Sequence, residues 1–252
     1  MDDENSVFVR LNMDEFEYIV LVGLGGDIVL RDLTGFYVEH EDPRYFIRLV
    51  DGGHYAMRHW SHEKFTRLAE KTEVSKELLL RDYKNLKIRT YPYFIGKERT
   101  KISVLAKDVI PDRSFVFDAT DNAASKKLIM EHCGILKQVV LISGGIEKEN
   151  VYVQVYIRID GKNITPPFYE YNPHIRDPKD ELPTERIRRG CLDQAQGDQP
   201  NIFSLMMVDA LSLCVFHKIL EHLRNGSIKD FNLREIFFNI FKMQMRIVAS
   251  KP

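Results

Sequence analysis

The sequence predicts an α/β protein with a Rossmann-like, mostly parallel sheet that has helices on both faces and is continued by antiparallel strands and a crossover loop. Two observations predict this fold. Up to about residue 145, short apolar runs alternate with longer segments of helical spacing, as in parallel strands joined by helices. Residues 151–159 then alternate between aliphatic side chains and aromatic or polar ones, and Asp160-Gly161 follows them. This pattern is typical of an antiparallel strand that ends in a turn.

The elements follow in order along the chain. The first half is predicted to contain strands at 16–22, 45–50, 86–90, 115–117 and 138–142 and helices at 28–36, 68–83 and 125–132. Glycines follow the first strand, and Gly144-Gly145 is expected to stop the fifth. Residues 163–200, rich in proline and charge, are predicted to form an irregular crossover or lid. Residues 202–224 read as a helix that is apolar nearly all round, which favours burial in the core over a subunit contact.

The length of 252 residues fits one domain spanning residues 1–252. Within it, residues 1–145 are predicted to form a nucleotide-binding half. Residues 146–252 are predicted to hold the antiparallel strands, the crossover loop and C-terminal helices.

Composition excludes several classes of protein. Lys and Arg number 36 against 37 Asp and Glu, a net charge of −1. This balance excludes an overall cationic coat for nucleic acid but not a local basic patch, and no nucleic-acid partner is expected. No uninterrupted apolar run approaches the length of about 18 residues that a membrane span needs, so no membrane is expected either. The three cysteines, Cys133, Cys191 and Cys214, include no CxxC pair and fit neither a disulfide framework nor a four-cysteine zinc site. A reducing, cytoplasmic location is therefore expected, and Cys214 within the long helix is expected to serve packing.

The first candidate site is the turn Gly23-Leu24-Gly25-Gly26 after the first strand. Glycines at this position let the backbone approach phosphates at the start of the next helix. Asp51 ends the second strand, where an acid accepts hydrogen bonds from ribose hydroxyls. Together they favour a nucleotide site over a purely structural turn, without telling ATP from NAD.

The second candidate site follows the strand at 115–117. Asp118-Ala119-Thr120-Asp121-Asn122 stands at the carboxyl edge of the predicted sheet, where a carboxylate holds Mg²⁺ together with phosphate oxygens. Lys71, near the start of a helix, is able to act as a point charge on a phosphate. The structural alternatives are that Asp121 caps the helix at Asn122 and that Lys71 is a solvated surface lysine.

These segments resemble the ThiF/MoeB family of adenylating enzymes, which are related to ubiquitin-activating enzymes. The resemblance spans about residues 16–223, is closest to phage- and plasmid-borne bacterial members that lack zinc cysteines, and is most specific at DATDN. The similar segments are FEYIVLVGLGG, YFIRLVD, KTEVSKELLLRDYKNLKIRTYP, FVFDATDNAASKKLI, VVLISGGIEKENVYVQVYIRIDGK and GCLDQAQGDQPNIFSLMMVDALSLCVFHKIL.

The resemblance implies that the chain uses ATP and Mg²⁺ to adenylate the C-terminal glycine of a ubiquitin-like or sulfur-carrier protein, working as a homodimer or as a heterodimer with a related subunit. It implies catalytic roles for Lys71, Asp121 and Cys191, with Asp121 also the magnesium ligand. Cys191 would either carry a thioester or be inert. Nucleotide contacts are implied for Gly23, Gly25, Gly26, Asp51 and Asn122.

The sequence departs from the family pattern at several positions. The family's Asn-x-x-Arg-Gln element is replaced by His59, His62 and Glu63, and no arginine stands at the matching position. Gly53 replaces the second acid of Asp-x-Asp. Arg58, Arg67 or a protonated His62 are candidates for the missing cation. A zinc site at the histidines at 54, 59 and 62 lacks the usual companion ligands.

Three functions stay open on these grounds. The first is the adenylating enzyme. The second is a catalytically degenerate relative that binds nucleotide and pairs with an active partner. The third is an NAD-dependent oxidoreductase, which the glycine turn and Asp51 allow but which leaves DATDN and Lys71 without a role.

Overall fold

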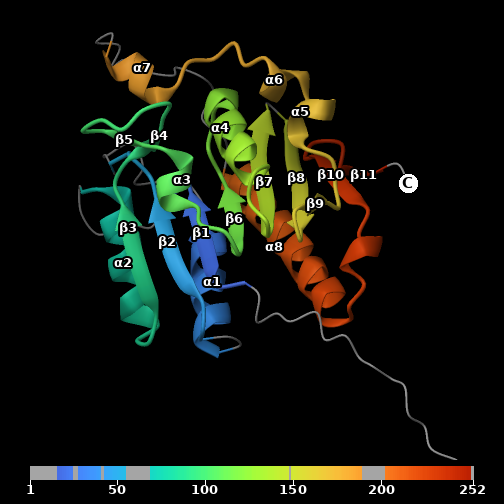
Figure 1. Ribbon diagram of the computed structural model, residues 1–252, viewed down its shortest axis with the longest axis horizontal. Coiled ribbons are helices and arrows are strands. Elements are labelled where there is room, and N and C mark those ends of the chain that lie inside the picture. Colours follow the sequence, from blue (N-terminus) through green and yellow to red (C-terminus); the bar gives the residue numbers. More distant parts are fainter. Residues whose placement is uncertain are drawn as a thin grey trace, which may run out of the picture.

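The computed structural model describes residues 16–24, 28–40, 43–54, 69–147, 149–188 and 202–250. Within them, nine strands form one sheet whose main path runs β11-β10-β8-β7-β6-β1-β2-β3, with β9 paired to β8 (Figure 1). The five strands β7, β6, β1, β2 and β3 are parallel, and β8, β10 and β11 continue the sheet antiparallel. The predicted fold class is therefore confirmed.

The parallel half is built from short strands, which are apolar and mostly buried except for the edge strand β3, whose side chains are exposed or half-buried. These strands are β1 (Tyr18–Val22), β2 (Phe46–Val50), β3 (Lys87–Tyr91), β6 (Ser114–Asp118) and the first part of β7 (Val139–Glu147). The helices between them are α1 (Ile28–His40), α2 (Lys71–Asp82), the short α3 (Ala106–Val109) and α4 (Ala123–Cys133). A small separate sheet pairs β4 (Phe94–Ile95) with β5 (Ser103–Val104).

The antiparallel half begins with β8 (Asn150–Ile159), which returns along β7. The short β9 (Lys162–Asn163) and the helices α5 (Phe168–Tyr171), α6 (Pro173–Arg176) and α7 (Pro183–Arg188) follow. The described part of the predicted irregular crossover, residues 163–188, thus contains three short helices. Helix α8 (Ile202–Arg224) and a 3₁₀ turn (Ile228–Asp230) precede β10 (Leu233–Asn239) and β11 (Gln244–Ala249). Of the segment expected to hold C-terminal helices, residues 202–224 are therefore helical, whereas residues 233–249 form a β-hairpin.

The sequence predicts that β7 ends at Gly144-Gly145, but the strand continues through both glycines to Glu147. A Cβ on Gly144 would lie 2.6 Å from Cγ1 of Val208, which belongs to α8. A Cβ on Gly145 would overlap the ring of Tyr152 on β8. The two glycines therefore admit a helix on one face and an aromatic ring on the other, and the strand passes through them.

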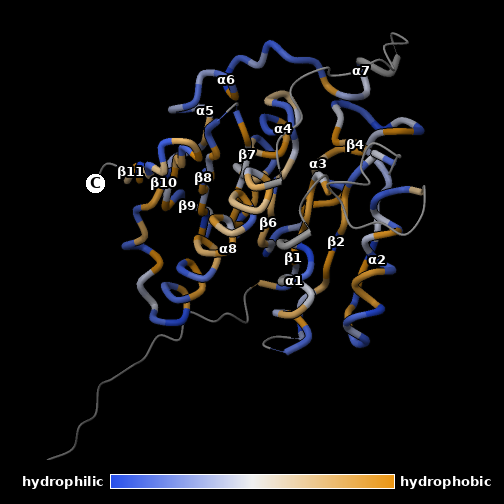
Figure 2. The backbone as a smooth tube through the Cα atoms, turned by 180° about the vertical axis from the view of Figure 1, so that it is seen from behind, coloured by the Kyte–Doolittle hydropathy of each residue, from blue (hydrophilic) through white to orange (hydrophobic). Residues whose placement is uncertain are grey.

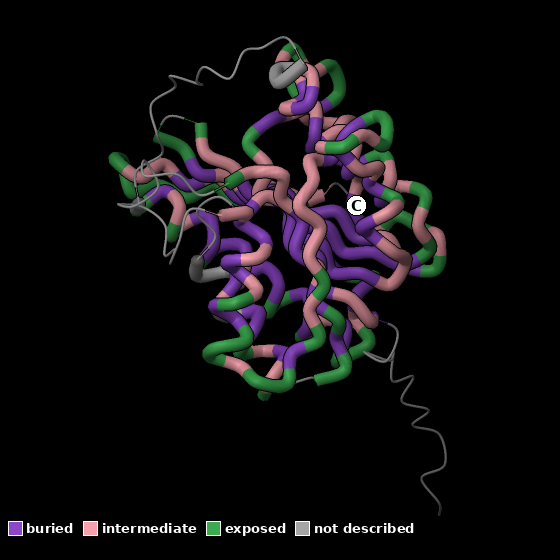
Figure 3. Tube along the Cα trace, turned by 90° about the vertical axis from the view of Figure 1, so that its left-hand side faces the viewer, coloured by how far each residue is buried: buried purple, intermediate pink, exposed green. Residues whose placement is uncertain are grey.

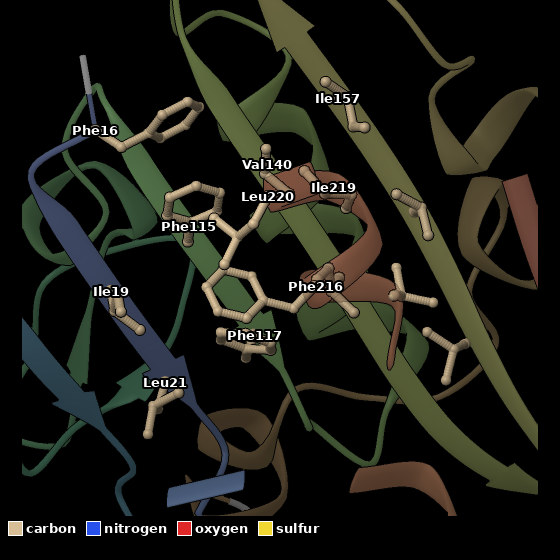
Figure 4. Packing of buried hydrophobic residues seen from close by; sticks show 14 of the residues in the cluster. Phe16, Ile19, Leu21, Phe115, Phe117, Val140, Ile157, Phe216, Ile219 and Leu220 are labelled. Atoms are coloured by element: carbon tan, nitrogen blue, oxygen red, sulfur yellow. The ribbon is translucent and has the colours of Figure 1, made fainter. Parts of the chain in front are cut away.

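Two apolar cores lie on opposite faces of the sheet. One contains the buried faces of α1 and α8, and in it Phe216 of α8 meets Phe115 and Phe117 of β6 (Figure 4). The other lies under α3, α4 and α5 and includes Val116, Ile129 and Phe168. Figure 2 shows the hydrophobic strands enclosed between these layers, and Figure 3 shows them buried.

Among the described residues, only the segment Phe203–Arg224 has the length and hydropathy of a membrane span. Half of that segment is buried inside the protein, and α8 contacts β7, β8 and α1. This placement confirms the expectation that α8 is a core helix.

Candidate functional site

The carboxyl edge of the parallel strands gathers the residues of the candidate site. Gly23 follows β1 with φ +80°, a conformation that favours glycine. A Cβ at Gly23 would lie 2.8–2.9 Å from backbone atoms of Ala119 and Thr120, so glycine is required by space as well. The backbone N–H of Gly23 also donates to Val50 O at 2.9 Å. Gly23 is thus held between the end of β2 and the DATDN segment.

Asp51 joins two turns at this edge. Its Oδ2 accepts a hydrogen bond from the backbone N–H of Leu24 at 2.6 Å, and its Oδ1 accepts one from the N–H of Gly53 at 2.6 Å. A carboxylate offers about four lone-pair sites, so two remain for further donors such as ribose hydroxyls. The side chain is half-buried, as a ligand contact requires.

Lys71 is the first residue of α2 and lies beside Asp51. Its backbone N–H donates to Gly53 O at 3.1 Å. A Cβ at Gly53 would lie 2.9 Å from Asp51 Oδ1 and 3.6 Å from Cδ and Cε of Lys71. The absence of a side chain at Gly53 therefore leaves space between the two. Lys71 is 9% exposed, so the alternative of a solvated surface lysine is wrong.

In the DATDN segment, the side chains of Asp118 and Asn122 make structural hydrogen bonds, whereas the carboxylate of Asp121 is accessible. Asp118 is buried, and its Oδ1 accepts hydrogen bonds from Thr120 N and Oγ1. Asn122 is the N-cap of α4, where its Oδ1 accepts from Ser125 N at 2.7 Å. The cap is therefore Asn122 itself and not Asp121, so the Asn122 side chain serves the helix in this structure.

Asp121 is exposed at the same edge, with only a 3.3 Å contact from Asn122 Nδ2 among the hydrogen bonds of the described residues. Mg²⁺ is commonly held by one or two carboxylates together with substrate phosphates. A single accessible carboxylate at the strand edge fits that mode. No cluster of three metal-ligating side chains occurs in the part of the chain that the structure describes.

A cavity of about 590 Å³ adjoins Asp121. Its walls are the start of α4, the ends of β7 and β8, the residues of α5 and α6, and β10. The segment from α6 to α7 crosses this edge at the top of Figure 1. The polar and aromatic residues that line the cavity include Asp121, Lys126, Tyr152, Tyr171, Asp180 and Glu235.

A buried polar row, Asp118, Ser143, Gln154 and Glu235, crosses four neighbouring strands beside this cavity. Ser143 Oγ donates to Asp118 Oδ2 at 2.8 Å, and Gln154 Nε2 donates to Glu235 Oε1 at 2.6 Å. Burial raises the pKa of Glu235, because the hydrogen bond from Gln154 and the nearby arginines offset only part of the desolvation.

Sequence reasoning missed three residues of this site. Lys126 is 3% exposed and donates to Ser143 Oγ at 2.9 Å and Gly144 O at 2.8 Å. The carboxylate of Asp180 accepts from Ala123 N and Ala124 N at the start of α4. Glu235 reaches the site from the last hairpin. Only Lys126 carried a local signal, its position four residues after Asn122, one turn into the helix.

Other predicted residues lie outside the described part of the chain. They are Gly25, Gly26 and Cys191 together with Arg58, Arg67, His59, His62 and Glu63. Their predicted roles stay predictions. Of the other two cysteines, Cys133 is buried, and burial raises the pKa of its thiol. Cys214 is exposed, so the expectation that it serves packing is wrong.

A parallel sheet that carries Gly23, Asp51, Lys71 and Asp121 at its carboxyl edge has the arrangement typical of nucleotide-binding α/β proteins. The model of the ThiF family matches residues 47–249. The chain therefore belongs to the ThiF family.

Solved structures share the fold. The chain is similar to PaaA, with 16% identity, a TM-score of 0.61, and 96% of this chain matched to 75% of that one. It is also similar to E. coli MccB crystallised with ATP, with 13% identity, a TM-score of 0.62, and 95% matched to 66%. MccB with MccA-N7isoASN gives 13% identity, a TM-score of 0.65 and the same coverage. No curated protein matches the chain.

Proposed function

We propose that this chain adenylates the C-terminal carboxylate of a small protein or peptide at the expense of ATP, and that the acceptor is a ubiquitin-like or sulfur-carrier protein ending in glycine. Membership of the ThiF family supports the reaction class. The observation that carries the proposal is the convergence of Gly23, Asp51 and Lys71 with DATDN at one sheet edge. No single one of these residues defines the reaction, but together they supply sites for the ribose and the phosphates of ATP.

The parts of ATP are assigned by chemistry. The free lone pairs of Asp51 accept the ribose hydroxyls. The Gly23 turn and the start of α1 lie against the phosphates, and Lys71 places its ammonium on them. Asp121 is the residue that would hold Mg²⁺. When bound, Mg²⁺ neutralises negative charge on the phosphate oxygens.

The reaction joins the acceptor to AMP. A carboxylate oxygen of the acceptor attacks the α-phosphorus, the bond from that phosphorus to the bridging oxygen of the β-phosphate breaks, and pyrophosphate leaves with the electron pair. The product is an acyl adenylate. The chain's contribution is positioning together with fixed positive charge on the phosphates, because phosphoryl and nucleotidyl transfers need little covalent help from the protein.

The cavity beside Asp121 is the proposed place for the end of the acceptor. It adjoins the carboxylate assigned to Mg²⁺, and Tyr152 and Tyr171 give it aromatic walls. An acceptor tail lying there would bring its terminal carboxylate toward the nucleotide. The exposed apolar residues of α8, Phe203 and Met206, are where we place the contact of a homodimer or heterodimer. We retain the cytoplasmic location as part of the proposal.

Calorimetric titration with Mg·ATP tests the nucleotide site. Lys71→Ala and Asp121→Ala are each expected to weaken binding about tenfold or more, since each loses a charged contact to phosphate or metal. Lys76→Ala, on the same helix as Lys71, and Glu131→Ala, on the helix that follows Asp121, are the controls and should bind as the wild type does. Equal affinity in all five proteins would contradict the assignment.

Pyrophosphate exchange into ATP tests the chemistry, with a small protein encoded beside this chain as the acceptor. Exchange that depends on the acceptor's last residue supports adenylation. The second candidate is the degenerate binding subunit, which Gly53 favours because it replaces a family acid beside Lys71. Tight Mg·ATP binding with no exchange, together with a stable complex with a related subunit, would establish that candidate and overturn adenylation by this chain.

A further inference from the structure

A buried arginine lies beside the candidate nucleotide site with few partners in the described part of the chain. Arg31 is the fourth residue of α1 and is 1% exposed. Its Nε lies 3.2 Å from Asp32 Oδ1, and its Nη1 donates to Ser75 Oγ at 3.4 Å. Its Nη2 is buried and has no hydrogen-bond partner among the described residues. A guanidinium has five N–H donors, so most of its hydrogen-bonding capacity is unused there.

The neighbouring helix adds a second unused polar group. Thr72 of α2 is fully buried, and its Oγ1 also lacks a partner within the described ranges. Thr72 precedes Ser75 by three residues, so the two lie on the same face of α2. Since Ser75 faces Arg31, the interface between α1 and α2 contains two buried groups that are able to donate and that find no acceptor in the residues the structure describes. Such groups are costly unless a ligand satisfies them.

The geometry of the helix pair directs these groups toward the sheet edge. Gly35, one turn after Arg31, packs on Leu79, one turn after Ser75, because a Cβ at Gly35 would lie 2.6 Å from Cδ2 of Leu79. The two helices therefore run side by side from the same edge of the sheet. Side chains on a helix lean toward its N-terminus, so Arg31 leans toward the turn in which Lys71 stands.

We propose that Arg31, assisted by Thr72, is a phosphate-binding residue of the nucleotide site and supplies the cation that the family pattern places elsewhere. Lys71, the proposed phosphate lysine, begins the helix turn that precedes Ser75. A phosphate oxygen at the start of α1 satisfies Nη2 and compensates the buried charge. This inference rests on the proposed function, because it assigns Arg31 to the phosphates of the same nucleotide.

Nucleotide affinities test the proposal directly. Arg31→Gln is expected to raise the Kd for Mg·ATP about tenfold or more and to leave the Kd for adenosine within about threefold. The Kd of Arg31→Lys for Mg·ATP is expected to lie between those of the wild type and Arg31→Gln, because this variant keeps the charge. Thr72→Val removes only the hydroxyl and is expected to weaken Mg·ATP by a smaller factor. Wild-type affinity for Mg·ATP in Arg31→Gln would overturn the inference while leaving the proposed function intact.

Stability separates ligand binding from a merely structural role. A buried cation with few partners costs stability, so Arg31→Gln is expected to unfold at the same or a higher urea concentration than the wild type when no ligand is present. A structural arginine predicts the opposite, namely a less stable variant that binds Mg·ATP normally. Arg48→Gln is the matched control. Arg48 is half-buried, donates to Val109 O and lies in the middle of β2.

Thermal unfolding with inorganic triphosphate distinguishes a failure of the Arg31 inference from a failure of the proposed function. It is expected to raise the melting temperature of the wild type and of Arg48→Gln but not that of Arg31→Gln. If triphosphate stabilises the proteins in this way but the wild type does not bind Mg·ATP, Arg31 is still an anion ligand and the proposed function is rejected. A melting temperature that rises equally in all three proteins would reject Arg31 as the anion ligand.

Discussion

The ammonium of Lys126 lies 3.4 Å from the carboxylate of Asp118, and both side chains are almost completely buried. The pair connects the end of β6 to the start of α4, and Lys126 also holds Ser143 and Gly144 of β7. The floor of the candidate site is therefore held by an ion pair that is almost completely buried. Asp121, three residues after Asp118, is left free at the surface.

Breaking this pair should be costly. Lys126→Met leaves the Asp118 carboxylate buried and unpaired, which is expected to lower the free energy of unfolding by about 3–5 kcal/mol. The double variant Lys126→Met/Asp118→Asn should lose clearly less than the sum of the single losses. Urea denaturation followed by circular dichroism measures both. Lys127→Met, at the half-buried neighbour that donates only to Arg176 O among the hydrogen bonds of the described residues, should stay within about 1 kcal/mol of the wild type. A similar loss in both single lysine variants would contradict the role given to Lys126.

Gly23 and Gly161 form a matched pair for testing the turn after β1. Both have positive φ, +80° and +73°, but a Cβ at Gly161 would meet only a side-chain nitrogen of Arg158 at 4.0 Å. Gly161→Ala should cost about 1–2 kcal/mol, the strain of a left-handed residue alone. Gly23→Ala should cost more, because its Cβ collides with the backbone of Ala119 and Thr120. Thermal unfolding compares the two, and equal losses would mean that space at Gly23 is not limiting.

Two neighbouring side chains, Asn122 and Asp121, should separate stability from ligand binding. Asn122→Ala removes the N-cap of α4 and is expected to cost about 1 kcal/mol of unfolding free energy. Asp121→Ala should leave that free energy within about 0.5 kcal/mol, because the side chain is exposed. In the presence of Mg·ATP only the wild type and Asn122→Ala should gain stability. A gain by Asp121→Ala equal to that of the wild type would remove Asp121 from the metal site.

The sequence predicted the parts of the site that stand directly after a strand. Gly23, Asp51 and the DATDN segment could be placed at one edge because parallel strands end together. Residues that reach the site across the chain could not be placed. Asp180 caps a helix that begins 57 residues earlier, and Glu235 bonds Gln154 across 81 residues. Such pairings depend on how the segment between α6 and α7 packs on α4 and on how β10 joins the sheet, and periodicity within a segment carries no information about either.

The role of Gly144 and Gly145 also could not be predicted from the sequence. Gly144 and Gly145 have the local signature of a strand end, but they serve packing against α8 and Tyr152. A glycine that admits a neighbour and a glycine that ends a strand look alike in the sequence, and only the tertiary partner tells them apart.

The protonation of Glu235 should make stability depend on pH. Burial raises the pKa of its carboxyl group above the value in the unfolded chain, so the native state binds this proton more tightly. The contribution of Glu235 to stability is therefore present at pH values below its unfolded pKa and is lost as pH rises through the raised pKa. Relative to the wild type, Glu235→Gln should gain stability as the pH is raised from about 4 to about 7. Urea denaturation at each pH measures the difference, and a difference that does not change with pH would contradict a raised pKa.

The thiols of Cys214 and Cys133 should differ sharply in reactivity, and the difference reports on the free face of α8. Cys214 is exposed on α8, whereas Cys133 is buried in α4 and has its pKa raised by burial, so little of it is thiolate. Iodoacetamide at mildly alkaline pH should therefore alkylate Cys214 in the native protein and Cys133 only after unfolding, as read by mass spectrometry of the peptides. Rapid native alkylation of Cys133 would contradict its burial.

The rate of alkylation at Cys214 also tests the proposed dimer. If a second copy covers Phe203 and Met206 on the same helix, alkylation of Cys214 should slow as protein concentration rises. Charged substitution of Met206 should then abolish that dependence on concentration, while leaving the rate at Cys133 unchanged.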